Sequence, residues 1–193
     1  NHGLLQVKKR PQWRVLRGGS QSYLAPLCAP FEKNIRTNCA VTAVVREEGQ
    51  SPRLRTHQGE ELSFDDIVIA THADQAMAML SDIDDTESSV LSELPYSENE
   101  VVLHTDTRLL PRKRLAWSSW NYRLRGSNSQ ATLTYNMNIL QGINSPETFC
   151  VTLNDSDAIH PRTILGEYRY AHPQFTIKGI AAQQRWPEIN GPR

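Results

Sequence analysis

Residues 64–72 read FDDIVIATH, a short β-branched run between polar residues. This pattern predicts a buried strand, because Val and Ile side chains suit a strand that is covered on both faces. The residues that follow place apolar side chains at 73, 76, 77 and 80, and this helical period predicts a helix over 73–80. His72 and Asp74 would then lie either at a ligand-facing crevice beyond the strand or at the cap of the helix.

A hairpin is expected just before this strand. Residues 35–45 alternate, with positions 41, 43 and 45 on one face, and end at the Glu-Glu-Gly turn of 47–49. Residues 54–57 are typical of the returning strand, and a second tight turn is expected at 58–60.

Residues 12–30 predict a turn that leads into a short helix. An alternating run over 12–17 predicts a short strand, which Gly18 and Gly19 interrupt. Ser20 can cap a helix that follows, and prolines at 26 and 30 would keep that helix short or kinked.

The second half of the chain is dominated by strand-like segments separated by turn-rich stretches such as 125–129. Four such segments are found, at 101–104, 116–120, 131–135 and 149–153, and a helix is expected over 161–170. The sequence therefore predicts an α+β fold with a mixed or antiparallel sheet and packing helices.

Charge is distributed unevenly along the 193 residues, although the net charge is zero. Residues 1–57 hold ten Lys or Arg against three acidic residues, 58–107 hold thirteen acidic residues and no Lys or Arg, and 108–193 hold eleven basic against five acidic. The acidic run of 82–87 is expected to be a solvated loop between helices. The basic thirds raise a nucleic-acid hypothesis, which requires that the cations cluster on one face.

Composition excludes several classes of protein. No apolar run approaches about 18 residues, so no membrane-spanning helix is expected. Three scattered cysteines fit a reducing compartment and predict a cytoplasmic protein. The chain opens with Asn1 rather than methionine, and we expect it to be a piece of a longer protein.

The sequence lacks the common catalytic motifs. It has no H-E-x-x-H, G-x-S-x-G, G-x-x-x-x-G-K-[ST] or G-x-G-x-x-G. No metal site and no complete Rossmann unit are therefore expected, and the sequence names no catalytic residue.

The order of Gly-Gly turn, helix, strand, hairpin and the 66–72 strand resembles the middle of the flavin-containing amine oxidoreductases, which include monoamine oxidase, polyamine oxidase and phytoene desaturase. The closer resemblance is to bacterial predicted FAD-binding oxidoreductases of that superfamily. The segments that carry it are spread over nearly the whole chain: 1–5, 10–15, 71–76, 103–106, 116–122, 134–138 and 170–173. In that family the dinucleotide fingerprint precedes this region and a second Gly-rich flavin contact follows it. The resemblance thus implies a central fragment, inert by itself, of a protein that uses FAD.

The resemblance also implies a division and a cofactor contact. Residues 1–81 would be a partial FAD-binding-domain segment, and residues 82–193 would form the substrate-domain sheet and helix. Val41 matches the valine whose backbone pairs with the FAD adenine. Gly18 and Gly19 match the turn whose helix packs near the cofactor, although they can also serve only to supply a positive φ.

Four aromatic residues are candidates for a substrate wall: Trp117, Trp120, Tyr122 and Tyr135. The alternative is that they belong to the core, as strand aromatics commonly do. His104 is expected to be a hydrogen-bonded, partly buried histidine rather than a catalytic base. The lysine that amine oxidases often place near the flavin is absent from 99–101, which reads Asn-Glu-Val.

The function implied for the parent protein is the transfer of a hydride equivalent from an unidentified small-molecule substrate to FAD. Two alternatives remain at this point. One is a binding or scaffold protein that keeps the fold without redox activity, and the other is a nucleic-acid-binding protein.

Overall fold

The computed structural model describes residues 12, 14–124 and 132–191. The chain divides into two compact units. Unit 1 consists of Asn1–Lys33 and Asn99–Tyr170, and unit 2 consists of Asn34–Glu98 and Ala171–Arg193. The resemblance segment at 1–5, part of that at 10–15, and the turn expected at 125–129 lie outside the described residues.

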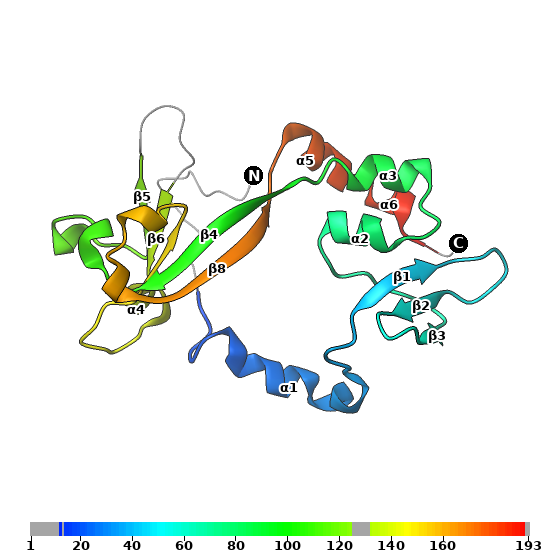
Figure 1. Ribbon diagram of the computed structural model, residues 1–193, viewed down its shortest axis with the longest axis horizontal. Helices are drawn as coiled ribbons and strands as arrows, with labels where there is room; N and C mark the ends of the chain where they lie inside the picture. The colour runs from blue at the N-terminus through cyan, green and yellow to red at the C-terminus, as the bar shows by residue number, and fades with distance from the viewer. Residues whose placement is uncertain (1–11, 13, 125–131, 192–193) are drawn as a thin grey trace. The chain divides into compact units, whose positions relative to one another are not determined.

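Unit 1 is built on a five-stranded sheet (Figure 1). Its strands, in spatial order, are β5 (Trp120–Arg123), β6 (Thr132–Asn136), β7 (Cys150–Leu153), β4 (Tyr96–His104) and β8 (Ile164–Pro173). The pairs β5–β6, β6–β7 and β7–β4 are antiparallel. This confirms the predicted α+β fold with an antiparallel sheet.

Two expectations for the second half were wrong. Residues 116–120 are not a strand, because a 3-10 turn (η4, Arg114–Ala116) precedes β5, which begins only at Trp120. The helix expected over 161–170 is one 3-10 turn (η6, Pro161–Thr163) followed by β8. The position of Pro161 at a first turn was predicted correctly, but the tyrosines at 168 and 170 stack on each other as residues i and i+2 of a strand do.

The short helices of unit 1 follow the Gly-Gly turn. They are η1 (Ser20–Tyr23), α1 (Leu24–Cys28) and η2 (Ala29–Asn34), which is broken at Phe31, where φ is −132°. The prediction of a short or kinked helix is confirmed. Ser20 does not cap it, since Gly19 holds the N-cap position without a side-chain hydrogen bond. The strand expected over 12–17 was wrong for the described residues 14–17, which form no strand. A further helix, α4 (Met137–Gln141), follows β6 and is capped by Asn136.

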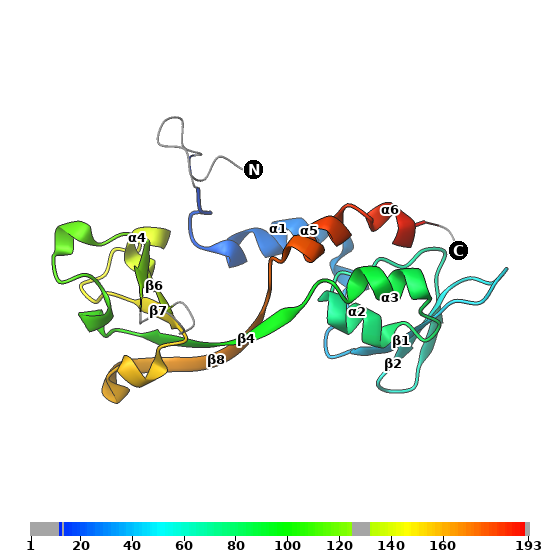
Figure 2. The ribbon, with the colours of Figure 1, turned by 90° about the horizontal axis from the view of Figure 1, so that it is seen from above.

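Unit 2 combines a small sheet with four helices (Figure 2). The antiparallel sheet has the order β1 (Val41–Val45), β2 (Arg53–Thr56), β3 (Glu61–Ser63). The helices are α2 (Ala73–Met79), α3 (Asp85–Leu91), α5 (Ile177–Gln183) and α6 (Trp186–Ile189). The hairpin of β1 and β2 and the helix α2 confirm the sequence predictions, whereas β3 and the other three helices were not predicted.

The core of unit 2 lies between β1 and α2. Val44, 2% exposed, forms a bridge with Leu80 at the end of α2. A bulge between Val41 and Ala43 alters the alternation of the strand, so Val44 is the buried residue rather than its predicted neighbours.

The strand predicted for 64–70 is absent, although this run is the most β-like of the sequence. Phe64 donates its backbone N–H to the carbonyl of Pro52, and beyond it no described strand pairs with this segment. Val68 is 90% exposed. A β-prone sequence forms a strand only when a partner edge accepts its backbone hydrogen bonds, and the described residues supply none here.

The acidic run of 82–87 is only in part the solvated loop expected between helices. Asp82 and Asp84 are exposed in the loop between α2 and α3, whereas residues 85–87 form the first turn of α3. Asp84 is the N-cap of α3, and its side chain accepts from the backbone N–H of Glu87 at 2.7 Å. The carboxylate of Glu87 is buried and pairs with Arg46 at the end of β1. The run thus starts a helix and ties it to the hairpin.

Candidate functional site

The register of unit 1 aligns apolar side chains in two rows on one face of the sheet, which we name the apolar face. Residues directly opposite each other in an antiparallel pair point to the same side. One row is Trp120, Tyr135, Val151 and Leu103, and the other is Tyr122, Leu133, Leu153 and Val101.

The apolar face is only partly covered within the described residues. Trp120 and Tyr122 are exposed by 44% and 68%, and Tyr135 is half-buried. The rings of Trp120 and Tyr135 meet edge to face, with centroids 6.4 Å apart. Burial, and to a lesser extent the nearby Tyr122, raises the pKa of the Tyr135 phenol, which therefore stays protonated at neutral pH. The face thus offers aromatic and aliphatic surface with a neutral hydroxyl at one side.

The opposite face of the sheet is buried and largely polar, although Val102 and Cys150 also lie on it. Thr134 and Thr152 lie opposite each other there, 4% and 1% exposed, and their hydroxyls are 2.9 Å apart. The Thr152 hydroxyl also lies 2.7 Å from Nε2 of His104. Each of these buried polar groups has a partner, as burial requires.

His104 is held in one neutral form by this network. The backbone N–H of Asp106 donates to Nδ1 at 3.0 Å, so Nδ1 carries no proton and Nε2–H donates to the Thr152 hydroxyl. Burial lowers the pKa of the imidazole, and the charge of Asp106 offsets this only partly. His104 is therefore a hydrogen-bonded structural histidine, as expected, and it points away from the apolar face.

Trp117 does not join the other three candidates. It follows η4, and its indole Nε1 donates to the carbonyl of Pro111 at 2.7 Å. The guanidinium of Arg114 lies 5.3 Å from the centre of its ring. The structure therefore brings together Trp120, Tyr122 and Tyr135, and leaves Trp117 in a loop.

The aliphatic members of the face were missed by sequence reasoning. Leu103, Leu133, Val151 and Leu153 alternate within their strands, which is the signal that marks them as one side of a sheet. The sequence could not show that the four strands are neighbours.

The residues predicted to contact the cofactor lie in different units. Gly18 and Gly19 adopt φ of 83° and 82°, so the expected positive φ is present at both. Val41 opens β1 opposite Thr56 and is half-buried. The assignment of all three to FAD stays a prediction.

Of the two roles considered for His72, the structure shows the cap of the helix. It holds the N-cap position of α2, and its backbone N–H donates to Oε1 of Gln75 at 3.3 Å. Its ring stacks on Tyr96 with centroids 4.2 Å apart. Asp74 lies in the first turn of the same helix.

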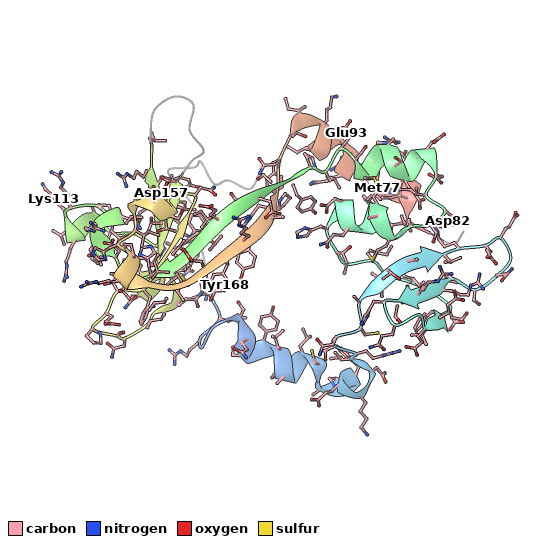
Figure 3. All side chains as sticks on the ribbon, viewed as in Figure 1. Met77, Asp82, Glu93, Lys113, Asp157 and Tyr168 are labelled. Carbon is pink, nitrogen blue, oxygen red and sulfur yellow. The ribbon has the colours of Figure 1, made fainter. Side chains whose placement is uncertain are left out.

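A groove of about 270 Å³ lies on the polar side of β4 and along β8. Its lining includes Glu100, Glu167 and Arg169, together with Tyr168, which is labelled in Figure 3. Its charges are mixed. Within the described residues, no group of three or more His, Cys, Asp or Glu side chains could hold a metal ion. Nor does any described helix have the length and apolar character needed to cross a membrane.

Comparison with known proteins gives one family and distant structural likenesses, one of which is described below. No curated protein matches the chain. The crystal structure of a CLA-producing fatty acid isomerase from P. acnes is similar at 14% identity with a TM-score of 0.47, over 88% of this chain and 35% of that one. This chain therefore spans about a third of the length of that protein. The family model for flavin-containing amine oxidoreductases matches residues 3–144, which is well over half of the sequence, and the chain belongs to that family.

Proposed function

We propose that the chain is part of a flavin-dependent oxidoreductase, and that the apolar face forms one wall of its substrate site. The observation that carries this proposal is the polarity of the sheet in unit 1. Its aromatic and aliphatic face is the more open one, while its threonines and histidine are buried on the other side. Small-molecule sites are lined predominantly by apolar and aromatic side chains with a few polar groups, as this face is.

FAD is the cofactor of the family to which the chain belongs. When bound, it would accept a hydride equivalent from the substrate. The chain's own residues would orient the substrate and exclude water from it. We propose Gly18 and Gly19 for the turn beside the cofactor, where both residues have a positive φ and carry no side chain. We propose Val41 for the adenine contact, and the division at residue 81 between a cofactor segment and a substrate segment.

Among the described residues of the first third of the chain, much of the positive charge is neutralised, which weakens the nucleic-acid alternative. Four arginines there are engaged in ion pairs with carboxylates: Arg36, Arg46, Arg53 and Arg55. Their partners come largely from the acidic segment, so the two opposite charge blocks neutralise each other locally. A phosphate-binding surface needs cations that are free to contact phosphates.

The proposal is tested first by absorption from 350 to 500 nm on the full-length protein purified with FAD, with this chain as the control. Flavin bands in the full-length protein are expected. Their absence from the full-length protein would contradict the proposal and favour a scaffold without redox chemistry.

The wall is tested next, in the flavin-loaded protein. Tyr135→Ala removes the aromatic centre of the face, and we expect kcat/KM to fall roughly tenfold, since buried aromatic contacts are worth about 1 kcal/mol or more. The flavin spectrum should not change. Tyr170→Ala, an aromatic removed elsewhere on the sheet, is the matched control. Equal effects of the two variants would remove the wall from the proposal.

A further inference from the structure

Residues 111–117 of unit 1 form a closed loop that we name the basic loop. Leu109 and Leu110 anchor its beginning, since both are buried. Its ends are joined by the hydrogen bond from the Trp117 indole to the Pro111 carbonyl. The intervening backbone is fixed by η4, with the N–H of Trp117 donating to the carbonyl of Arg114 at 3.0 Å. The loop is therefore an ordered projection.

The side chains that this loop presents are three consecutive cations followed by a leucine. Arg112, Lys113 and Arg114 are exposed, and none forms an ion pair with another residue that the structure describes. Figure 3 shows Lys113 at the outer edge of the η4 segment, directed away from the sheet. Arg108, four residues earlier, is in contrast paired with the buried Asp106.

Leu115 has no covering atoms, at 103% exposure. One exposed leucine alone needs no explanation. Here it directly follows three exposed cations that form no described ion pair, on a loop whose base is held by buried leucines and an indole hydrogen bond. Cations beside a protruding aliphatic side chain match an interface that is anionic at its surface and apolar just below.

We propose that the basic loop docks the protein reversibly on an anionic phospholipid surface. Arg112, Lys113 and Arg114 would contact the headgroups, and Leu115 would enter the boundary of the acyl chains. A single-stranded nucleic acid is a poorer match for this loop, because it is bound by stacking on free aromatic rings and Trp117 is the loop's one aromatic residue. The indole of Trp117 is instead occupied by its contacts with Arg114 and Pro111.

The test is sedimentation of the full-length protein with vesicles of phosphatidylcholine containing 30% phosphatidylserine, against vesicles of phosphatidylcholine alone. Binding is expected only with phosphatidylserine, and it should weaken when NaCl is raised from 50 to 500 mM. Each cation near such a surface contributes about fivefold to binding. The triple variant Arg112→Gln, Lys113→Gln, Arg114→Gln should therefore bind roughly 100-fold more weakly.

A matched triple variant separates the loop from net charge. It replaces Lys33, Arg162 and Lys178, which are exposed and take part in no described ion pair, with glutamine. It changes the net charge equally and should bind almost as well as the unaltered protein. Leu115→Ser should weaken binding about tenfold with little change in salt dependence, since the lost contribution is apolar burial.

Three outcomes would overturn the proposal. They are no sedimentation with phosphatidylserine vesicles at 50 mM NaCl, equal losses in the two triple variants, and binding to single-stranded RNA that is stronger than binding to vesicles. Circular dichroism of each variant checks that it is folded.

Discussion

The buried ion pair of unit 2 allows a sharp stability prediction. Arg46 donates to both carboxylate oxygens of Glu87, at 2.6 and 2.9 Å, and through Nε to Asp82 at 3.1 Å. The Glu87 side chain is 3% exposed and that of Arg46 is 20% exposed. The hydrogen bonds that Arg46 donates to Glu87 raise the pKa of the guanidinium further above its ordinary value. Arg46→Met would leave the carboxylate buried without its counter-charge.

The expected loss follows from the geometry. Removal of one partner of a buried pair costs about 3–5 kcal/mol, because the remaining charge is desolvated. Glu87 keeps the backbone N–H of Asp84 as a donor, and the partial exposure of Arg46 lets water approach. We therefore expect the lower end of this range, about 3 kcal/mol. Arg53→Met breaks the pair between Arg53 and Glu47, whose side chains are 33% and 48% exposed. This loss should cost at most about 1 kcal/mol.

The measurement is the free energy of unfolding in urea, followed by circular dichroism at pH 7. The double variant Arg46→Met, Glu87→Met removes both charges and should recover a large part of the loss, since no carboxylate is then stranded. The reasoning that burial makes the Arg46–Glu87 pair different is refuted if Arg46→Met and Arg53→Met lose stability to within about 0.5 kcal/mol of each other. That margin is roughly the effect of one ordinary surface substitution.

Three further outcomes are expected. Gly19→Ala should destabilise by about 1–2 kcal/mol in the same assay, because its φ of 82° is unfavourable for an L side chain while space is open around it. Burial lowers the pKa of His104, so as the pH falls the unfolded state takes up the extra proton first. The contribution of His104 to the free energy of unfolding should therefore be constant above pH 6.5 and should fall below it, by at most about 1.4 kcal/mol per pH unit. A His104→Gln variant should lack this slope. Burial raises the pKa of the Cys150 thiol to about 11, so iodoacetamide at pH 7.5 should label Cys28 and Cys39 but not Cys150 until urea is added, as mass spectrometry would detect.

The elements that the sequence predicts correctly are those whose pattern is local. The helix α2 repeats apolar residues at the helical period over two turns, and β6 and β7 alternate within five residues. The error at β8 has a local cause too, since Pro161 begins a turn that ends after three residues, and Tyr168 and Tyr170 then follow a period of two.

Other features depend on contacts between residues distant in the sequence. Arg46 and Glu87 are 41 positions apart, and no pattern in the sequence pairs them. Residues 64–70 have the composition of a strand, yet the described part of the chain offers no edge on which they could pair. In the five-stranded sheet, β8, the last of its strands along the chain, lies beside β4, the first of them. Composition sets what a segment can form, and the available partner decides whether it forms.

The candidate site, too, depends on strand pairing that the sequence alone does not show. Residue type alone selected Trp120, Tyr122 and Tyr135, but their common face follows from the register of β5 on β6. A slip of one residue would turn these side chains to the buried side and bring Asn121 to the open one. Folding stability alone favours an apolar face turned inward and a polar face turned to water. In unit 1 the threonines and His104 are instead buried and hydrogen-bonded, while the aromatic side chains are the more exposed. A local rule broken along β5 and β6 is expected at functional sites, although β4 and β7 also bury Val101, Val102 and Cys150. This reversal is why the apolar face, and not the buried histidine, is the place to test for substrate.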